Sequence, residues 1–170
     1  MIRVVIDSVR VSLMSQHRMV VLREMDGNRY LPIWIGPFEA DSITIELQGV
    51  PMARPLTHDL LKSVLEELGV SVAYVVVNDL RDDTFYAQLV LDADGVRKEI
   101  DSRPSDAIAL AVRTRSAIYV ADHVMDEASI VAETDADSAA LSPEEEKNLS
   151  VFRDFLESLD DEPREPGRQS

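Results

Sequence analysis

The sequence predicts an α+β fold in which three main helices pack on a mixed, largely antiparallel sheet. Two observations lead to this class. Stretches rich in β-branched residues are joined in pairs by short turns, and helical stretches with apolar residues stand between these pairs. At 170 residues the chain is long enough for one well-packed core, so one domain is expected, and we place it at residues 1–130.

The strands are expected mainly in hairpins. Residues 2–14 partly alternate between apolar and polar side chains, and residues 17–25 follow as their partner. The turn signal Asp-Gly-Asn at 26–28 leads into a third strand over 29–35, which completes an antiparallel meander. The remaining strands are predicted at residues 70–80, 84–92, 96–101 and 117–121.

The first two helices have recognisable beginnings and ends. Pro37 suits the first turn of a helix that stops at Gly49, and Thr57 can cap a second helix that ends at Gly69. The second helix is expected to pack through one apolar side, which consists of Leu60, Leu61, Val64, Leu65 and Leu68.

The third helix follows an abrupt change of character within residues 99–113. The first part of this stretch is charged, and the second part is almost wholly small and apolar, which predicts a buried helix that runs to about Arg113. Pro104 with Ser102 or Ser105 as a cap explains how this helix starts.

The last third of the chain carries most of the negative charge. The net charge is −15, and residues 121–170 hold 15 Asp or Glu against 4 Lys or Arg. Residues 131–142 have the composition of an acidic linker, and residues 160–170 are expected to be a disordered tail. Between them, residues 143–159 predict a short amphipathic helix, which can dock on its own domain or on a partner.

The composition excludes several kinds of site. The chain has no cysteine, so disulfides, zinc fingers and thiol catalysis are excluded, and it has neither a glycine-rich phosphate loop nor a His-Glu-x-x-His motif. The N-terminal stretch lacks the layout of a signal peptide, and no apolar run approaches the roughly 20 residues of a membrane helix. We therefore expect a cytoplasmic protein that does not enter a membrane.

Polar side chains gather at the beginnings of all three helices. The clusters are Glu39 and Asp41 in the first, Arg54, Thr57, His58 and Asp59 in the second, and Asp101, Ser102, Arg103, Ser105 and Asp106 in the third. Helix capping explains each cluster taken singly, because an acid in a first turn gains about 0.3–1 kcal/mol from the helix dipole. Taken together, the same residue types are those that phosphodiester hydrolysis requires. Carboxylates can hold Mg²⁺ or Mn²⁺, histidine can transfer a proton, and arginine can hold a phosphate.

Three motifs add a resemblance to these local patterns. "LPIWIGPFEADSI" at 31–43, "RPLTHDLLKSVLEELG" at 54–69 and "IDSRPSDAIALAVR" at 100–113 resemble, in this order and spacing, the bifunctional nuclease domain family. The similarity covers about residues 1–130. It implies an α+β fold, action on both DNA and RNA, and oligomeric assembly. Many relatives continue into a UvrB/UvrC-type motif, whereas this chain continues into its acidic segment.

The leading hypothesis is a metal-assisted nuclease of low sequence specificity that acts on DNA and RNA. It assigns catalytic roles to His58, Asp59, Asp101 and Asp106, substrate binding to Arg54, Arg103 and Ser105, and the ligation of Mg²⁺ or Mn²⁺ to Asp101, Asp106 and Glu39. The rival is a non-catalytic, oligomeric ligand-binding or regulatory protein of the same fold, which the acidic balance favours. A homo-oligomer, dimer or trimer, is expected because an extended first hairpin offers an edge for pairing.

Overall fold

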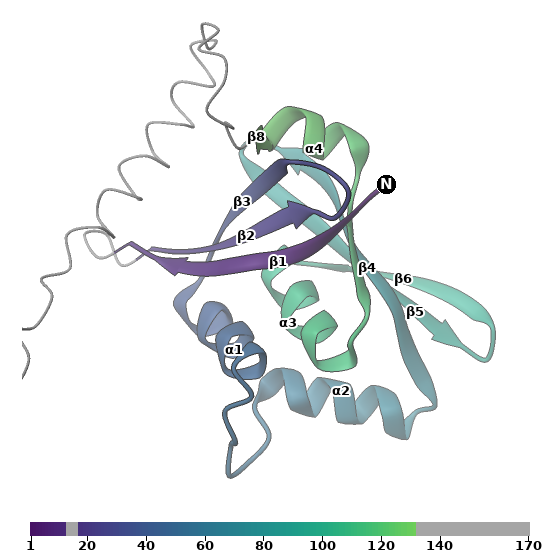
Figure 1. Ribbon diagram of the computed structural model, residues 1–170. Coiled ribbons are helices and arrows are strands. Elements are labelled where there is room, and N and C mark those ends of the chain that lie inside the picture. The colour runs from purple at the N-terminus through teal and green to yellow at the C-terminus, as the bar shows by residue number, and fades with distance from the viewer. Residues whose placement is uncertain (13–16, 132–170) are drawn as a thin grey trace, which may run out of the picture.

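The computed structural model describes residues 1–12 and 17–131, and their strands form one continuous sheet (Figure 1). Within these residues the sheet has eight strands in the order β6-β5-β4-β7-β1-β2-β3-β8. The strands are β1 (Ile2–Val11), β2 (Arg18–Glu24), β3 (Arg29–Ile35), β4 (Val70–Arg81), β5 (Thr84–Ala93), β6 (Val96–Ser102), β7 (Ala117–Val120) and β8 (Ile130–Val131). Four helices accompany them in the same described residues, namely α1 (Pro37–Leu47), α2 (Thr57–Glu67), α3 (Pro104–Thr114) and α4 (Asp122–Ala128).

The strand pairing confirms the predicted mixed and largely antiparallel sheet. Every neighbouring pair is antiparallel except β4 and β7, which run parallel over residues 74–77 and 117–120. β7 pairs with β1 over residues 2–4 only. Among the described strands, the outer part of β1 therefore has a partner on one side alone, and that partner is β2.

Helix α3 lies at the centre of the helical layer, as its apolar sequence predicted. It packs against β4, β5 and β7, while α1 and α2 pack on α3 in turn (Figure 1). Its five residues from Ala107 to Ala111 are all buried, because the small alanine side chains let the neighbouring elements approach closely. Pro104 occupies the first turn as expected, but the N-cap is Arg103, and neither Ser102 nor Ser105 caps the helix.

Helix α2 differs from its prediction in two respects. Its N-cap is Leu56 rather than Thr57, and the Asp59 carboxylate accepts the Leu56 backbone N–H at 2.7 Å, so an acid at the third helical position replaces the predicted hydroxyl. Of its five apolar residues only Leu65 packs against the core. The other four residues form an apolar side of the helix, and each of them is 38–70% exposed. They are Leu60, Leu61, Val64 and Leu68.

Two elements near the end of the described chain were not predicted. Helix α4 lies against β3 and β4, and the short strand β8 extends the sheet beside β3. The predicted linker at 131–142 falls outside the described residues except for Val131, and the predicted helix at 143–159 and tail at 160–170 lie wholly outside them. No helix of the described part is long and apolar enough to cross a membrane.

Candidate functional site

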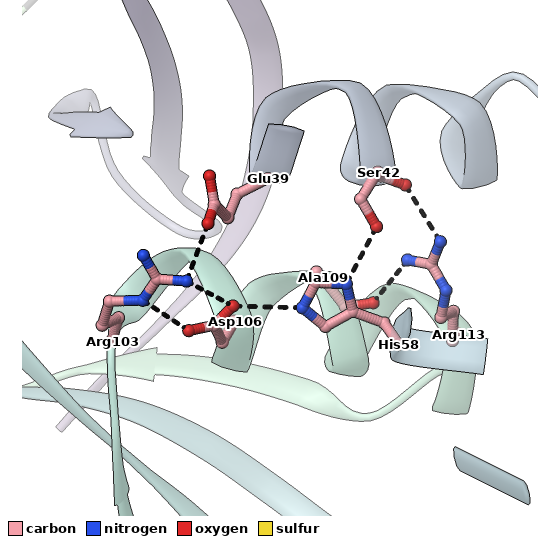
Figure 2. Close-up of polar contacts among 7 residues, drawn as sticks. All are labelled: Glu39, Ser42, His58, Arg103, Asp106, Ala109 and Arg113. Atoms are coloured by element: carbon pink, nitrogen blue, oxygen red, sulfur yellow. Dashed lines mark hydrogen bonds and ion pairs between the residues drawn. The ribbon is translucent and has the colours of Figure 1, made fainter. Parts of the chain in front are cut away.

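The beginnings of α1, α2 and α3 meet, and their polar side chains form one connected network (Figure 2). Arg103 at the start of α3 donates from Nη2 to Glu39 Oε1 of α1 at 2.7 Å. His58 of α2 lies 3.1 Å from Asp106 of α3, measured from Nε2 to Oδ1. Packing of α1 and α2 on α3 thus unites residues 48 and 64 positions apart in the sequence.

Both ring nitrogens of His58 have partners. Nε2 faces Asp106, and Nδ1 lies 3.0 Å from the hydroxyl oxygen of Ser42 on α1. Because a carboxylate only accepts, the contact with Asp106 assigns the proton to Nε2. A hydroxyl can donate or accept, so Ser42 can serve Nδ1 in both the neutral and the charged form of the ring.

Arg103 connects the two carboxylates at the exposed rim of the network. Its Nε donates to Asp106 Oδ2 at 2.7 Å, and its Nη2 is shared between Glu39 and Asp106 (Figure 2). The Arg103 side chain is 65% exposed, and among the described residues its Nη1 has no hydrogen-bond partner. This nitrogen can therefore bind an anion from solvent without breaking a contact within the protein.

Gly36 makes room for one member of this network. A Cβ at this position would lie 2.2 Å from Glu39 Oε2, so the carboxylate occupies the space that any other side chain would take. Gly36 is also the N-cap of α1, and its φ of −68° is ordinary for any residue. The glycine is therefore explained by the position of the Glu39 side chain and not by backbone strain.

A second set of contacts centres on Arg113 and adjoins His58 through Ser42. The Arg113 side chain is only 2% exposed, and its Nε donates to Asp59 Oδ1 at 2.5 Å. Its other nitrogens donate to the backbone carbonyls of Ala109 at 2.8 Å and Ser42 at 3.1 Å. Ser42 therefore joins the two sets, because its hydroxyl contacts His58 and its carbonyl contacts Arg113 (Figure 2).

Opposing effects set the pKa values of the two central aspartates. Burial raises the pKa of the Asp106 carboxyl, but hydrogen bonds from Arg103 and His58 outweigh burial and hold that pKa below its usual value. Burial also raises the pKa of Asp59, and the Leu56 N–H and Arg113 lower it by more. Both side chains are therefore carboxylates at neutral pH.

Stability should consequently fall in acid. An unfolded aspartate has a pKa of about 3.9, so the stabilising effect of Asp59 and Asp106 is complete above about pH 5 and is lost as pH falls through their lower native pKa values. We expect the unfolding free energy from urea titrations to decline below about pH 4. The Asp59→Asn variant should show a shallower decline, while Asp83→Asn, in an exposed turn, should follow the parent. Equal slopes in all three proteins would contradict this account.

The remaining predicted site residues lie apart from the network. Asp101 is exposed on β6, opposite Gln88 of β5, and Ser105 is buried in the first turn of α3. Arg54 is exposed in the segment between α1 and α2, where it lines a pocket together with Asp59 and Arg113. None of these residues contacts His58 or Arg103 through a hydrogen bond or ion pair within the described part of the chain.

The predicted metal ligands do not form a cage. Glu39 and Asp106 both bind the Arg103 guanidinium, which takes the position that a shared cation would need. Across residues 1–12 and 17–131, no group of three or more His, Asp or Glu side chains is arranged to hold a metal ion. The residues thus do not fit a preformed Mg²⁺ or Mn²⁺ site, and we derive no step through a metal.

The sequence patterns missed two members of the network, Ser42 and Arg113. Ser42 stands in the middle of a helix, where a serine does not act as a cap, and its place within the motif at 31–43 did not reveal a partner. Arg113 lies in the last turn of a buried apolar helix, and a long basic residue among buried ones was the signal that could have indicated an internal partner.

Together these contacts define a class of site: a histidine held between a serine and an aspartate, beside an exposed arginine that can bind an anion. The chain belongs to the bifunctional nuclease domain family, whose model matches residues 20–133. An uncharacterized protein of Mycobacterium tuberculosis H37Rv is 39% identical over 151 residues, which cover 89% of this chain and 90% of that protein.

Relatives that carry the name bifunctional nuclease are found in plants. Bifunctional nuclease 2 of Arabidopsis thaliana is 26% identical over 170 residues, which cover 87% of this chain and 52% of that protein. Bifunctional nuclease 1 of Oryza sativa subsp. japonica is 29% identical over 110 residues, or 62% of this chain and 33% of that protein. This chain therefore corresponds to about half or less of the plant proteins.

Proposed function

We propose that this protein hydrolyses phosphodiester bonds in DNA and RNA with low sequence specificity. The observation that carries the proposal is the His58–Asp106 pair beside the exposed Arg103 guanidinium. The match to the family and the names of the plant relatives support the same reaction. The chemistry below uses only residues whose contacts have been described.

Arg103 binds the phosphate in this proposal. Its Nη1, which has no hydrogen-bond partner in the described part of the chain, offers N–H groups at the exposed rim, and a phosphodiester oxygen is a suitable acceptor for them. The nearby Glu39 and Asp106 hold the guanidinium in place, so little side-chain freedom is lost when substrate binds.

His58 supplies the proton. In its charged form the Nε2–H gives up its hydrogen bond to Asp106 Oδ1, and the proton passes to the leaving oxygen as the phosphorus–oxygen bond breaks, while the Nδ1–H donates to Ser42. A water oxygen forms the new bond to phosphorus and releases its proton to solvent. Solvent then returns a proton to Nε2, where the Asp106 carboxylate again stabilises the charged ring.

Substitution of Asp106 by asparagine tests the proposal. The variant loses the negative charge that both Arg103 and His58 bind, and a hydrogen bond to a charged group contributes about 1.5–3 kcal/mol. We expect cleavage of labelled single-stranded DNA and RNA to slow by about 10- to 100-fold, with Asp83→Asn equal to the parent. Equal cleavage by parent and Asp106→Asn would indicate a contaminating nuclease.

The same assay decides the predicted roles of Asp101 and of a divalent ion. Asp101→Asn should slow cleavage if Asp101 is catalytic, as the sequence predicted. Cleavage that persists in EDTA would support the metal-free arrangement of Glu39, Arg103 and Asp106. Cleavage that requires added Mg²⁺ or Mn²⁺ would support the metal-assisted mechanism and would contradict the steps written above.

We also propose that the protein forms a homo-oligomer, either a dimer or a trimer. The exposed apolar side of α2 supports this, because large contiguous apolar surfaces usually mark a contact site. Replacing Leu60 and Val64 by glutamate should lower the mass measured by light scattering to that of one chain. The exposed pair Thr84 and Lys98, replaced by glutamate, serves as the control. A parent protein that is already monomeric would contradict the proposal.

A further inference from the structure

A pocket of about 340 Å³ lies beside the His58 network and is lined by residues of α1, of the segment that joins α1 to α2, of α2 and of α3. Its volume falls within the range of about 300–1,000 Å³ that is usual for small-molecule sites. Arg113 and Asp59 form one wall, and both belong to the second set of contacts, which centres on Arg113. Ser42 links this wall to the network, because its hydroxyl contacts His58 and its carbonyl accepts from Arg113.

Two charged side chains in this pocket are available to a ligand. Arg54 and Glu46 both line it, and neither side chain has a hydrogen-bond or ion-pair partner among residues 1–12 and 17–131. The charges of Asp59 and Arg113, in contrast, are already paired with each other. Among its described lining residues, the pocket therefore offers one cation and one carboxylate that are not paired within the protein.

The rest of the lining includes an apolar surface. Ile45, Val50 and Met52 contribute to it, and Met52 is 47% exposed although it is large and apolar. A flat, apolar ring system can cover such residues, and the flexible methionine side chain adapts to a ring of varied shape. An apolar surface, together with an arginine and a carboxylate that are unpaired among the described residues, matches the parts of a nucleotide. These parts are the base, its phosphate, and the N–H groups at the edge of the base.

We propose that this pocket binds one unpaired nucleotide of the substrate strand. The phosphate contacts Arg54, the base covers the apolar surface, and an exocyclic amino group donates to Glu46. This inference rests on the proposed nuclease function and deepens it. A base can enter the pocket only when it is out of a duplex, so single strands are the substrate class.

Binding measurements test the subsite independently of cleavage. The probes are AMP, UMP and inorganic phosphate, titrated by calorimetry against the full chain. AMP should bind about tenfold or more tightly than phosphate and more tightly than UMP, whose base lacks an amino group. Glu46→Ala should remove the preference for AMP over UMP. If phosphate binds as tightly as AMP, or if AMP does not bind, the pocket is not a nucleotide site.

Ala53 lies in the exposed segment that lines the pocket, and the Ala53→Trp variant places a large side chain there to block it. Lys98→Trp on β6 is the matched control. Ala53→Trp and Arg54→Ala should each weaken AMP binding by about tenfold or more, while Lys98→Trp should bind like the parent. Circular dichroism confirms folding of each variant. If Ala53→Trp is folded and binds AMP as the parent does, the assignment of the pocket is wrong.

Two further comparisons separate the possible outcomes. A single-stranded tetra-adenylate with phosphorothioate links should displace AMP, and a hairpin duplex should not. Displacement by neither would indicate a site for free nucleotides and would overturn the proposal. His58→Ala should bind AMP within about twofold of the parent while losing cleavage. If AMP binding depends on Arg54 but the protein cleaves neither DNA nor RNA, only the nuclease function is rejected. If the protein cleaves but AMP binding does not depend on Arg54, only the subsite is rejected.

Discussion

The Asp59→Asn variant is expected to lose about 3 kcal/mol of unfolding free energy, because Arg113 would keep its charge in the interior without an anionic partner. Removal of one member of a buried ion pair costs about 3–5 kcal/mol. We expect the lower end of this range, because Asp59 is itself 31% exposed and Arg113 retains two backbone carbonyls. The substitution also removes the carboxylate that accepts the Leu56 N–H at the start of α2.

Urea and thermal unfolding measure this effect directly. A loss of 3 kcal/mol corresponds to a fall of about 6–12 °C in melting temperature for a protein of this size. The double variant Asp59→Leu with Arg113→Met should recover part of the loss, because it removes both charges and fills the space with apolar atoms. A change below about 1 kcal/mol in Asp59→Asn would show that the pair contributes little to stability.

The same variant bears on the predicted catalytic role of Asp59. Its contacts give the carboxylate a structural task at the junction of α2 and α3. Cleavage should therefore be assayed at a temperature at which the variant remains folded. If the folded Asp59→Asn variant cleaves like the parent, the Asp59 carboxylate has only a structural role. Slower cleavage would support the catalytic prediction.

Replacing His58 by alanine is expected to slow cleavage by about 10²- to 10⁴-fold, the usual contribution of a general acid or base. The residue is the only histidine within the network, and Asp106 and Ser42 fix the orientation of its ring. His58→Gln is the conservative variant, since its amide can keep polar contacts with these partners but cannot transfer a proton at neutral pH. Both variants should lose cleavage, and His58→Gln should retain more stability.

The pH dependence of cleavage separates proton transfer from a structural role. Because the proposed mechanism uses a proton donated by the ring, we expect the cleavage rate of the parent to fall as pH rises. The residual activity of His58→Gln should lack this fall. Parallel pH profiles for the parent and the variant would exclude His58 as the proton donor even if His58→Gln is slow.

Much of the fold follows from local sequence patterns. The hairpins, the first turns of α1 and α3 at Pro37 and Pro104, and the burial of α3 were predicted correctly. Each depends on turn residues, on proline geometry or on hydrophobic content, all of which act over a few neighbouring positions. Helix α4 was missed because its seven residues show no clear periodicity beyond one turn.

The apolar side of α2 shows where a correct local pattern led to a wrong expectation. The five apolar residues have helical spacing, and the helix exists as predicted. Their spacing shows that they share a side of the helix, but it does not show what covers that side. Within the described chain only Leu65 of these five packs against the core, while α2 lies against α3 and β4.

The sequence by itself determined the α+β class, the three helix starts and the residue types gathered there. Only the tertiary structure decided that Glu39, His58, Arg103 and Asp106 are partners, and that Ser42 and Arg113 join them. The physical reason is the range of the forces concerned. Capping and periodicity act between near neighbours, whereas these contacts join residues up to 71 positions apart and exist because α1 and α2 both pack on α3.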